Sequence, residues 1–351
     1  MSVLFVDSFD HYATADFAQK YDMIGTTQTT IAATGRWGSN AFRATGGNGY
    51  LRKGVNPGSQ VAIVGFAIKF NATGQYAFCE TFSSVIDERP MVLFTKNSNG
   101  SISAWRASDG TGSSGSMSFA FCTLLGSTPA GIVNNGTWNY IELKVDHDNA
   151  GTVEIAVNGN VELSEVGTVD TLPTGRIYDA IGFGLGASTG TTDFDDFYIA
   201  DDQGADVNDF VGDSRIEAIY PESDGTHLDW TPSAGSPHWS LVDETAPNGD
   251  TDYVSTTAPG NQDSYNYQTV SGAGDIIAVQ VNIVARKEAS GTKKVKALAR
   301  VSAADFLSTE EHALAMDYKD YRAIYTNNPD TAAPWSAAEV NASEFGVEVT
   351  L

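Results

Sequence analysis

The stretches LFVDSFD at residues 4–10 and FDDFYI at residues 194–199 decide the fold of the first two hundred residues. Both combine aromatic and aliphatic side chains with aspartates, and the chain between them carries short alternating apolar runs rather than a long amphipathic helix. This arrangement is typical of a β-sandwich whose first and last strands are neighbours. The residues after 200 are then expected to form a separate part.

The composition also favours β structure. The chain has 351 residues, which is enough for two domains with separate cores. It contains 35 glycines, and only 18% of its residues are charged, whereas long helices normally use more Glu, Lys and Arg. These values predict many short strands joined by turns.

The formal net charge is −24, from 44 acidic and 20 basic residues. Such a surface repels nucleic acid and anionic membranes, so neither is expected as a partner. The two cysteines, Cys79 and Cys122, are too few for a disulfide framework and are expected on core strands. The apolar run at residues 3–6 is too short for a signal peptide or a membrane span, so we expect folding in the cytosol.

The best alternating pattern of the first half is a pair of runs at residues 136–145 and 152–159, joined by a turn. The run at residues 61–70 is continuously apolar and predicts a buried strand. Residues 11–25 predict one short helix or a loop with a helical turn. Residues 109–118 are rich in Gly and Ser and predict a flexible loop.

The predicted hairpin carries a recognisable motif. It reads WxYxExKV at residues 138–145 and TVxIxVNG at residues 152–159, and the segment closes with DDFYI at residues 195–199. Over roughly residues 1–200 these motifs resemble the concanavalin-A/laminin-G type of jelly roll. The resemblance implies a two-sheet sandwich but no single function, because lectins, glycosidases and structural proteins all use this fold.

The second half predicts a smaller β-sandwich after an acidic linker that begins at residue 201. Alternating apolar residues at 276–285 and 293–301 predict a hairpin, and residues 318–326 and 345–351 predict closing strands. The predicted fold is therefore all-β, with a jelly-roll domain at residues 1–200, a linker at residues 201–214 and a second β-sandwich domain at residues 215–351.

Four motifs spread along the chain carry a wider resemblance. They are VDSFDHY at residues 6–12, DDFYIADD at 195–202, WTPSAGS at 230–236 and VNASEFGV at 340–347. With them the chain resembles a family of tailed-bacteriophage virion proteins over nearly its full length. The resemblance implies a structural protein on the particle surface, as capsid decoration, head fibre or tail component. It also implies assembly in the host cytoplasm with other virion proteins as partners.

No catalytic set is recognised in the sequence. The string GASTG at residues 186–190 matches G-x-S-x-G, but a strand follows it instead of the helix that a nucleophile elbow requires. Jelly-roll glycosidases place carboxylates on alternate residues of one strand, whereas the adjacent Asp87 and Glu88 would point to opposite faces. We therefore expect no enzymatic activity. The alternative left open is a glycan-degrading enzyme with an unrecognised carboxylate pair.

Two groups of aspartates are candidate cation ligands. Asp146 and Asp148 lie at a turn that begins as some calcium loops do, although such a loop also needs a later bidentate carboxylate. Asp193, Asp195 and Asp196 precede the acidic linker. The structural alternatives are a hairpin turn for the first group and strand-end aspartates beside a solvated linker for the second. No cofactor is expected, and calcium is the ion that these residues would suit.

Six of the twenty basic residues fall between positions 286 and 300. Lys294, Lys296 and Arg300 share the outward parity of one predicted strand, and Lys293 precedes them. One interpretation is that these lysines guard an edge strand against pairing with another sheet. The alternative is a partner-binding surface that docks on an acidic patch of a neighbouring subunit, which favours a homo-oligomer.

Aromatic side chains at loop tips could stack on the apolar face of a sugar ring. Trp105, Tyr253, Tyr265 and Tyr267 are the candidates. Trp105 is expected in the core, whereas Tyr265 and Tyr267 lie in the polar stretch DSYNY and are expected at the surface. The second hypothesis for function is therefore a carbohydrate-binding adhesion module for host surface glycans.

Overall fold

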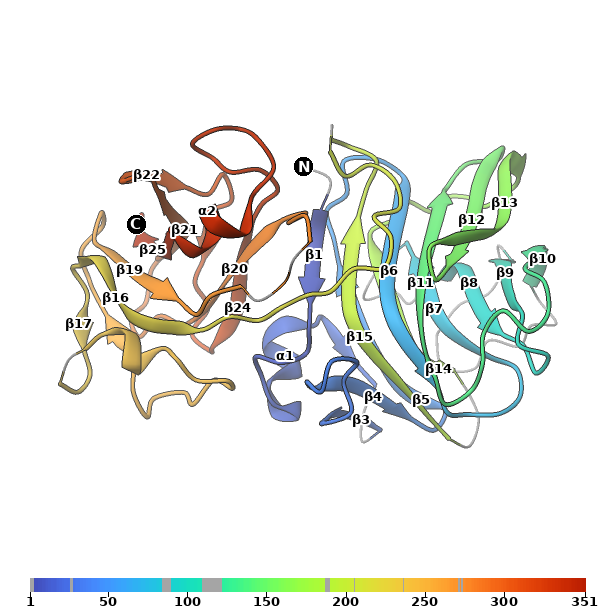
Figure 1. Ribbon diagram of the computed structural model, residues 1–351, viewed down its shortest axis with the longest axis horizontal. Helices are drawn as coiled ribbons and strands as arrows, with labels where there is room; N and C mark the ends of the chain where they lie inside the picture. Colours follow the sequence, from blue (N-terminus) through green and yellow to red (C-terminus); the bar gives the residue numbers. More distant parts are fainter. Residues whose placement is uncertain are drawn as a thin grey trace. The chain divides into compact units, whose positions relative to one another are not determined.

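The computed structural model confirms an all-β protein built from antiparallel sheets. It describes residues 3–25, 28–83, 90–108, 122–186, 190–204, 206–235, 237–270, 272 and 274–351. The chain forms two compact units (Figure 1). Unit 1 comprises the described residues up to Asp10 together with Tyr21–Ile216, and unit 2 comprises His11–Lys20 together with Glu217–Leu351.

Sheet A of unit 1 has the order β13-β12-β11-β6-β15-β4-β3, and β1 pairs with β15. The first and last strands of unit 1 are therefore neighbours, as predicted, with Val3 opposite Ala200 and Asp7 opposite Phe197. The strands are β1 (Val3–Asp7), β3 (Thr29–Ala32), β4 (Ala41–Thr45), β6 (Val61–Phe70), β11 (Trp138–Asp146), β12 (Gly151–Val157), β13 (Asn160–Val169) and β15 (Thr191–Ala200).

Sheet B of unit 1 has the order β10-β9-β8-β7-β14-β5-β2. Aromatic rings of both sheets meet in the core, because Phe183 of β14 lies 4.2 Å from Phe197 and 5.5 Å from Phe194 between ring centroids. The strands are β2 (Met23–Ile24), β5 (Asn48–Gly54), β7 (Tyr76–Phe82), β8 (Pro90–Lys96), β9 (Ile102–Ala107), β10 (Cys122–Ser127) and β14 (Ala180–Gly186).

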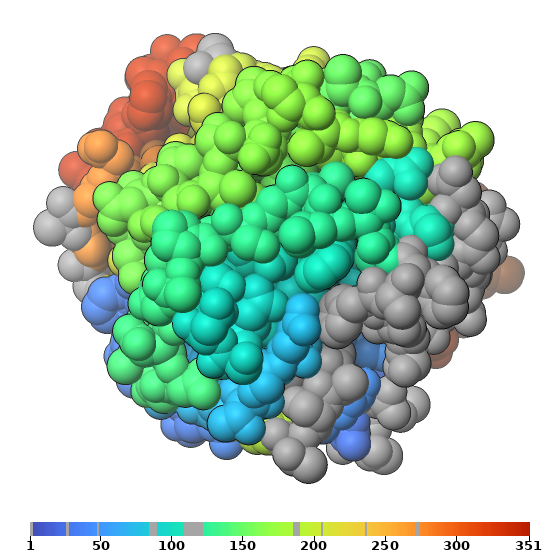
Figure 2. All heavy atoms as spheres, turned by 90° about the vertical axis from the view of Figure 1, so that its right-hand side faces the viewer, coloured from blue at the N-terminus to red at the C-terminus, as the bar shows by residue number. Residues whose placement is uncertain are grey.

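The outermost strands of the two sheets, β13 and β10, come together at one end of the sandwich. Figure 2 looks onto this end, where the green residues of β12 and β13 lie beside the teal residues of β10. Gly126 of β10 makes this approach possible, because a Cβ there would lie 3.0 Å from the Leu163 side chain. Three apolar side chains of this end are exposed, namely Leu124, Val161 and Val166.

Residues 201–216 pack as part of unit 1, although the sequence predicts a solvated linker for 201–214. Asp201 and Val207 are buried. The backbone N–H groups of Val211 and Gly212 both donate to Glu142 Oε1 on β11, at 2.8 and 2.9 Å. An acidic composition does not reveal such bonds, because the donors are backbone groups that every residue except proline carries.

The short helical segment predicted near the N-terminus is present as η1 (Thr14–Asp16) and α1 (Phe17–Lys20). It belongs to unit 2, whereas the sequence assigns it to the first domain. Lys319 of unit 2 donates from Nζ to Ala18 O at 2.6 Å. In the described ranges no helix is long and apolar enough to cross a bilayer.

Sheet C of unit 2 has the order β16-β19-β25-β21-β22, with β23 also on β21, and two further pairs are β17–β18 and β20–β24. The elements are β16 (Pro221–Leu228), β17 (Thr231–Pro232), η3 (Trp239–Leu241), β18 (Val254–Ser255), β19 (Gln262–Tyr267), β20 (Val279–Ala285), β21 (Lys294–Val301), β22 (Ala304–Leu307), β23 (His312–Ala313), β24 (Lys319–Tyr325), α2 (Ala337–Asn341) and β25 (Glu344–Val349).

The predicted hairpin between residues 276–285 and 293–301 is wrong. Both segments contain strands, but β20 pairs with β24, and β21 pairs with β25, β22 and β23. The prediction that alternate residues of these strands face the core is confirmed, since Val281, Ala297 and Ala299 are all buried in one apolar cluster. Alternation reports which face of a strand is buried and not which strand lies beside it.

Candidate functional site

The outer face of sheet B is the candidate site, and strand register identifies its residues. Phe183 points into the core, so its neighbour Gly182 lies on the outer face. Gly182 is opposite Arg52 on β5 and Glu80 on β7. The same row continues across β8 to Trp105 on β9, because Leu93 is opposite both Glu80 and Trp105.

Four side chains of this face combine charge with aromatic rings, and we call them the outer-face cluster. They are Tyr50, Arg52, Glu80 and Trp105. Tyr50, Glu80 and Trp105 are half-buried, and Arg52 is 3% exposed. Tyr50 shares the face with Arg52 because the two are separated by one residue on β5.

The absence of a side chain at Gly182 on β14 lets the side chains of the neighbouring strands approach one another. A Cβ at Gly182 would lie 2.6 Å from the Phe82 ring and 3.2 Å from Arg52 Cγ. Without that atom, the Arg52 guanidinium lies 4.3 Å from the Phe82 ring centroid and 4.8 Å from that of Tyr50. The cation therefore lies within cation–π distance of two aromatic rings, which restrict its position.

Trp105 is held in one orientation. Its Nε1 donates to Thr95 Oγ1 at 3.0 Å, and the ring packs on a small cluster that contains Leu93 and Ala107. The sequence expectation of a core tryptophan is thus corrected, since the ring lies on the outer face and is half-buried. A fixed ring with one side toward solvent loses little entropy when it binds a ligand.

Glu80 supplies the negative charge of the face. Burial raises the pKa of the Cys122 thiol on β10, and the negative charge of Glu80 raises it further. Cys122 and Cys79 form no disulfide. The cluster can accept at the Glu80 carboxylate and present the ring faces of Tyr50 and Trp105. Sequence reasoning missed Tyr50, Arg52 and Glu80, for which the only signal was their alternate spacing on strands.

The aspartates at the β11–β12 turn do not come together as a ligand set. Asp148 Oδ1 accepts from Ala150 N at 3.0 Å, which is a local turn bond. Burial and the nearby charge of Asp148 raise the pKa of Asp146. Among the described residues, no group of three or more His, Cys, Asp or Glu side chains is arranged to hold a metal ion.

The oxygens of the second aspartate group are occupied by protein donors. Arg43 Nε lies 2.6 Å from Asp193 Oδ1, and Arg36 N donates to Asp195 Oδ2 at 2.7 Å. The Arg36 guanidinium also lies 3.6 Å from Asp196 Oδ2. Burial raises the pKa of Asp195 to about 8 and that of Asp196 to about 6. These carboxylates fasten chain segments to sheet A.

The basic residues of unit 2 lie on a central strand and not on an edge. Because β21 has β25 on one side and β22 with β23 on the other, the edge-guard interpretation is wrong. Lys294 Nζ lies 2.6 Å from Glu311 Oε2, and Arg300 Nη1 lies 2.6 Å from Asp305 Oδ1. Lys293 and Lys296 are half-buried. Partner binding by this cluster stays a prediction.

Of the two glycan candidates of unit 2, Tyr265 is a core residue and Tyr267 is half-buried. Tyr265 is 5% exposed and its hydroxyl donates to Asp263 at 2.8 Å. Tyr267 packs edge-on against Phe345 with 5.9 Å between centroids. The expectation that Tyr265 stacks on sugars at the surface is corrected by its burial, whereas glycan binding by Tyr267 stays a prediction.

Three sequence features lie outside the described residues. They are Asp87 with Glu88, the central positions 187–189 of the G-x-S-x-G string, and the Gly- and Ser-rich loop at residues 109–118.

No family model matches the chain, and no curated protein matches it. Solved structures similar to it include an endo-β-1,4-glucuronan lyase from the fungus Trichoderma reesei, at 14% identity over 56% of this chain and 94% of the lyase, with a TM-score of 0.38. The alginate lyase Aly36B is 13% identical over 56% of this chain and 96% of its own, with a TM-score of 0.38. The carbohydrate esterase vb_24B_21 from the Shiga toxin-encoding bacteriophage phi24B is 14% identical over 56% of this chain and 99% of its own, with a TM-score of 0.35.

The prediction of a protein without enzymatic activity is corrected by these comparisons, because two lyases and an esterase stand among the similar structures. All three are named for carbohydrate substrates. At such identities and TM-scores the similarity assigns no substrate and no residue role to this chain.

Proposed function

We propose that the outer-face cluster of sheet B binds carbohydrate. The observation that supports this most directly is the half-buried indole of Trp105, held by Thr95 in the same row as Glu80. An aromatic face suits the apolar side of a pyranose ring. The carboxylate of Glu80 lies on the same face and suits sugar hydroxyls.

The biological setting that we propose is the surface of a tailed-bacteriophage particle, where the protein acts as an adhesion module for host surface glycans. This part rests on the sequence resemblance described above. Other virion proteins are the proposed partners, and the cluster of Lys293, Lys294, Lys296 and Arg300 is the proposed contact for them or for a second copy of the chain.

The test of carbohydrate binding compares two tryptophan variants of the full chain. Trp105→Ala removes the ring from the outer-face cluster, and Trp138→Ala removes a half-buried ring from β11 of the other sheet. Affinity is measured by calorimetry on host surface polysaccharide, alginate and glucuronan, with circular dichroism to check folding. We expect Trp105→Ala to raise Kd at least about tenfold, which is roughly 1.4 kcal/mol, and Trp138→Ala to leave it unchanged.

Equal losses in the two variants, or a folded wild-type protein that binds none of the glycans, would contradict the proposal. The wild-type protein and the variant Glu80→Gln are also incubated with the same glycans, and the products that each releases are measured. Product that depends on Glu80 would make the surface a catalytic one. Binding without product would limit it to recognition.

A further inference from the structure

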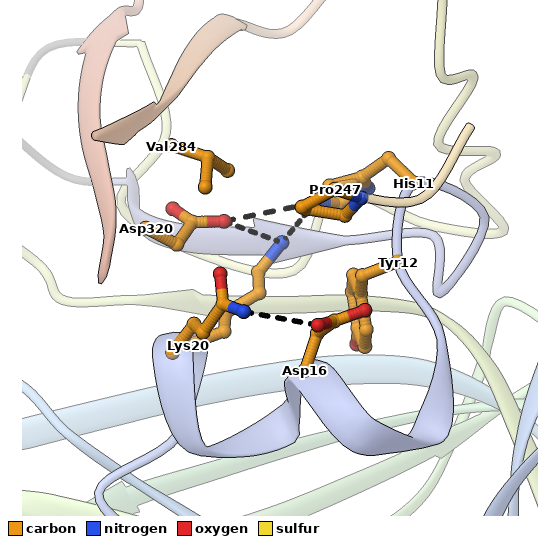
Figure 3. A pocket seen from close by; sticks show the side chains of 8 residues that line it. His11, Tyr12, Asp16, Lys20, Pro247, Val284 and Asp320 are labelled. Carbon is orange, nitrogen blue, oxygen red and sulfur yellow. Dashed lines mark hydrogen bonds and ion pairs between the residues drawn. The ribbon is translucent and has the colours of Figure 1, made fainter. Parts of the chain in front are cut away.

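Unit 2 contains a small cavity, about 10 Å³ in volume, beside the segment His11–Lys20 (Figure 3). Lys20 Nζ lies 2.5 Å from His11 Nε2 and 3.8 Å from Asp320 Oδ2, so the charged groups at the cavity contact one another. A space of this size is at the lower limit for one water molecule, and it admits no organic ligand. The contacts at the cavity attach the N-terminal segment to unit 2.

Trp37 of unit 1 presents a surface that a ligand can reach. It lies between β3 and β4, and it is 54% exposed. Its Nε1 donates to Asp196 Oδ2 at 3.1 Å, and the backbone N–H of Arg36 donates to Asp195 Oδ2 at 2.7 Å. The indole is therefore accessible and fixed in orientation, so that binding a ligand costs it little entropy.

The groups that fix Trp37 are costly to place. Asp195 and Asp196 are each 1% exposed, and burial raises the pKa of both. Asp196 has a φ of 50°, in the left-handed region, where β15 shifts its register against β6 between Asp195 and Tyr198. Left-handed backbone at residues other than glycine and register shifts of this kind are frequent at functional sites, where they aim a side chain.

Two guanidinium groups lie against the indole of Trp37. That of Arg36 is 4.8 Å and that of Arg215 is 5.7 Å from the ring centroid. The protein itself uses Arg36, whose Nη2 donates to Asp213 Oδ2 at 2.6 Å. Arg215 is exposed, and it forms no hydrogen bond or ion pair with any residue that the structure describes. Its donors are therefore open to an anionic group of a ligand.

We propose that Trp37 and Arg215 form a binding site for an acidic sugar, a pyranose that carries a carboxylate. The sugar ring stacks on the exposed part of the indole, and its carboxylate pairs with the guanidinium of Arg215. A neutral sugar leaves the guanidinium unused, and an acidic peptide lacks the apolar ring face that suits the indole. Nucleic acid is repelled by the net charge of −24.

This site shares no residue with the outer-face cluster of sheet B, so either surface can bind without the other. Trp37 and Arg215 flank strands of sheet A, whereas Tyr50, Glu80 and Trp105 lie on strands of sheet B. The inference therefore adds a second contact for a glycan and assigns it a preference for acidic sugars.

The test follows the indole N–H signals of the full chain by nuclear magnetic resonance. Trp37→Phe identifies the signal of Trp37 among those of the six tryptophans. Glucuronan and cellulose oligosaccharides of equal length are titrated, because their sugars differ in carrying a carboxylate or a hydroxymethyl group. We expect the glucuronan oligosaccharide to shift the Trp37 signal with a Kd at least about tenfold lower than that of the cellulose oligosaccharide.

Arg215→Gln should abolish this preference, whereas Arg286→Gln removes the same charge from unit 2 and should keep it. An unshifted Trp37 signal, equal Kd values for the two oligosaccharides, or a preference that survives Arg215→Gln overturns the proposal. A glutamate peptide that binds as tightly also overturns it, because the site would then recognise charge alone. The Trp105 signal reports on the outer-face cluster in the same titration, so the failure of one site is distinguished from the failure of the other.

Discussion

His147 shows how surroundings set the chemistry of a single residue. In the sequence it stands in a candidate calcium loop, yet in the fold its ring is buried and stacks 5.0 Å from Tyr178. Its Nδ1 lies 2.7 Å from Gln60 O and its Nε2 lies 2.9 Å from Thr81 Oγ1. A carbonyl only accepts, so Nδ1 carries the hydrogen and Thr81 donates to Nε2. Burial lowers the pKa of His147 to about 4.

This pKa predicts a pH dependence of stability. The folded state binds the proton of His147 more weakly than the unfolded state, where the pKa is near 6.5. The stabilisation is therefore complete above pH 6.5 and is lost as the pH falls toward 4, at about 1.4 kcal/mol per pH unit. In chemical denaturation, we expect His147→Gln to be less stable than the wild type at neutral pH and this deficit to shrink by ~3 kcal/mol near pH 4.

Tyr178→Phe is the matched control for this experiment. It keeps the stacked ring and both hydrogen bonds of the imidazole, and it removes a buried hydroxyl that has no partner among the described residues. Its stability should follow the wild-type pH dependence. A deficit of His147→Gln that stays constant from neutral to acidic pH would show that the histidine does not titrate differently in the two states.

At the scale of elements, strand β25 shows what register demands of one residue. It lies between β19 and β21, and Gly346 is opposite Ser264 on one side and Leu298 on the other. A Cβ at Gly346 would lie 1.9 Å from Asp263 O and 2.8 Å from Ser264 Cα. Both are backbone atoms, so no side-chain rotation can relieve the contact.

We expect Gly346→Ala to destabilise unit 2 by about 3 kcal/mol, because β19 must move away from β25 and weaken their ladder. The measurement is urea denaturation followed by tryptophan fluorescence. Gly274→Ala is the control, since nothing lies within 4 Å of a Cβ at that position, and its effect should stay within about 0.5 kcal/mol. Equal stabilities of the two variants would mean that the strands are farther apart than described.

At the scale of the whole molecule, the net charge of −24 opposes compactness through self-repulsion. Salt screens such repulsion over distances of about 10 Å at 0.1 M. Burial also raises the pKa values of Asp195, Asp196 and Glu142, which is a desolvation effect that salt does not screen.

We therefore expect NaCl to raise Tm at neutral pH in scanning calorimetry. Calcium chloride at equal ionic strength should raise it no further, because the oxygens of Asp193, Asp195 and Asp196 are taken by protein donors. A chelator should leave both Tm and the mass from light scattering unchanged. A rise specific to calcium, or a loss of mass on chelation, would restore the aspartates as metal ligands.

The strands and their buried faces were predictable from the sequence, because alternation of apolar residues is a local property of the chain. The hairpin of β11 and β12 and the closure of unit 1 by β1 and β15 are two such cases. The metal candidates and the glycan candidate Tyr265 failed because they relied on residue type. Asp195 and Tyr265 have suitable side chains, but their neighbours in the fold use or bury them.

The sequence by itself determined the all-β class, the strand positions and the inward parity of each core strand, since these depend on residues near one another in the chain. Only the tertiary structure decided that β21 is central, that residues 11–20 belong to unit 2 and that Tyr50, Arg52, Glu80 and Trp105 share one face. Pairing partners and shared faces join residues far apart in the chain. They are selected by the packing of whole sheets, which no local pattern encodes.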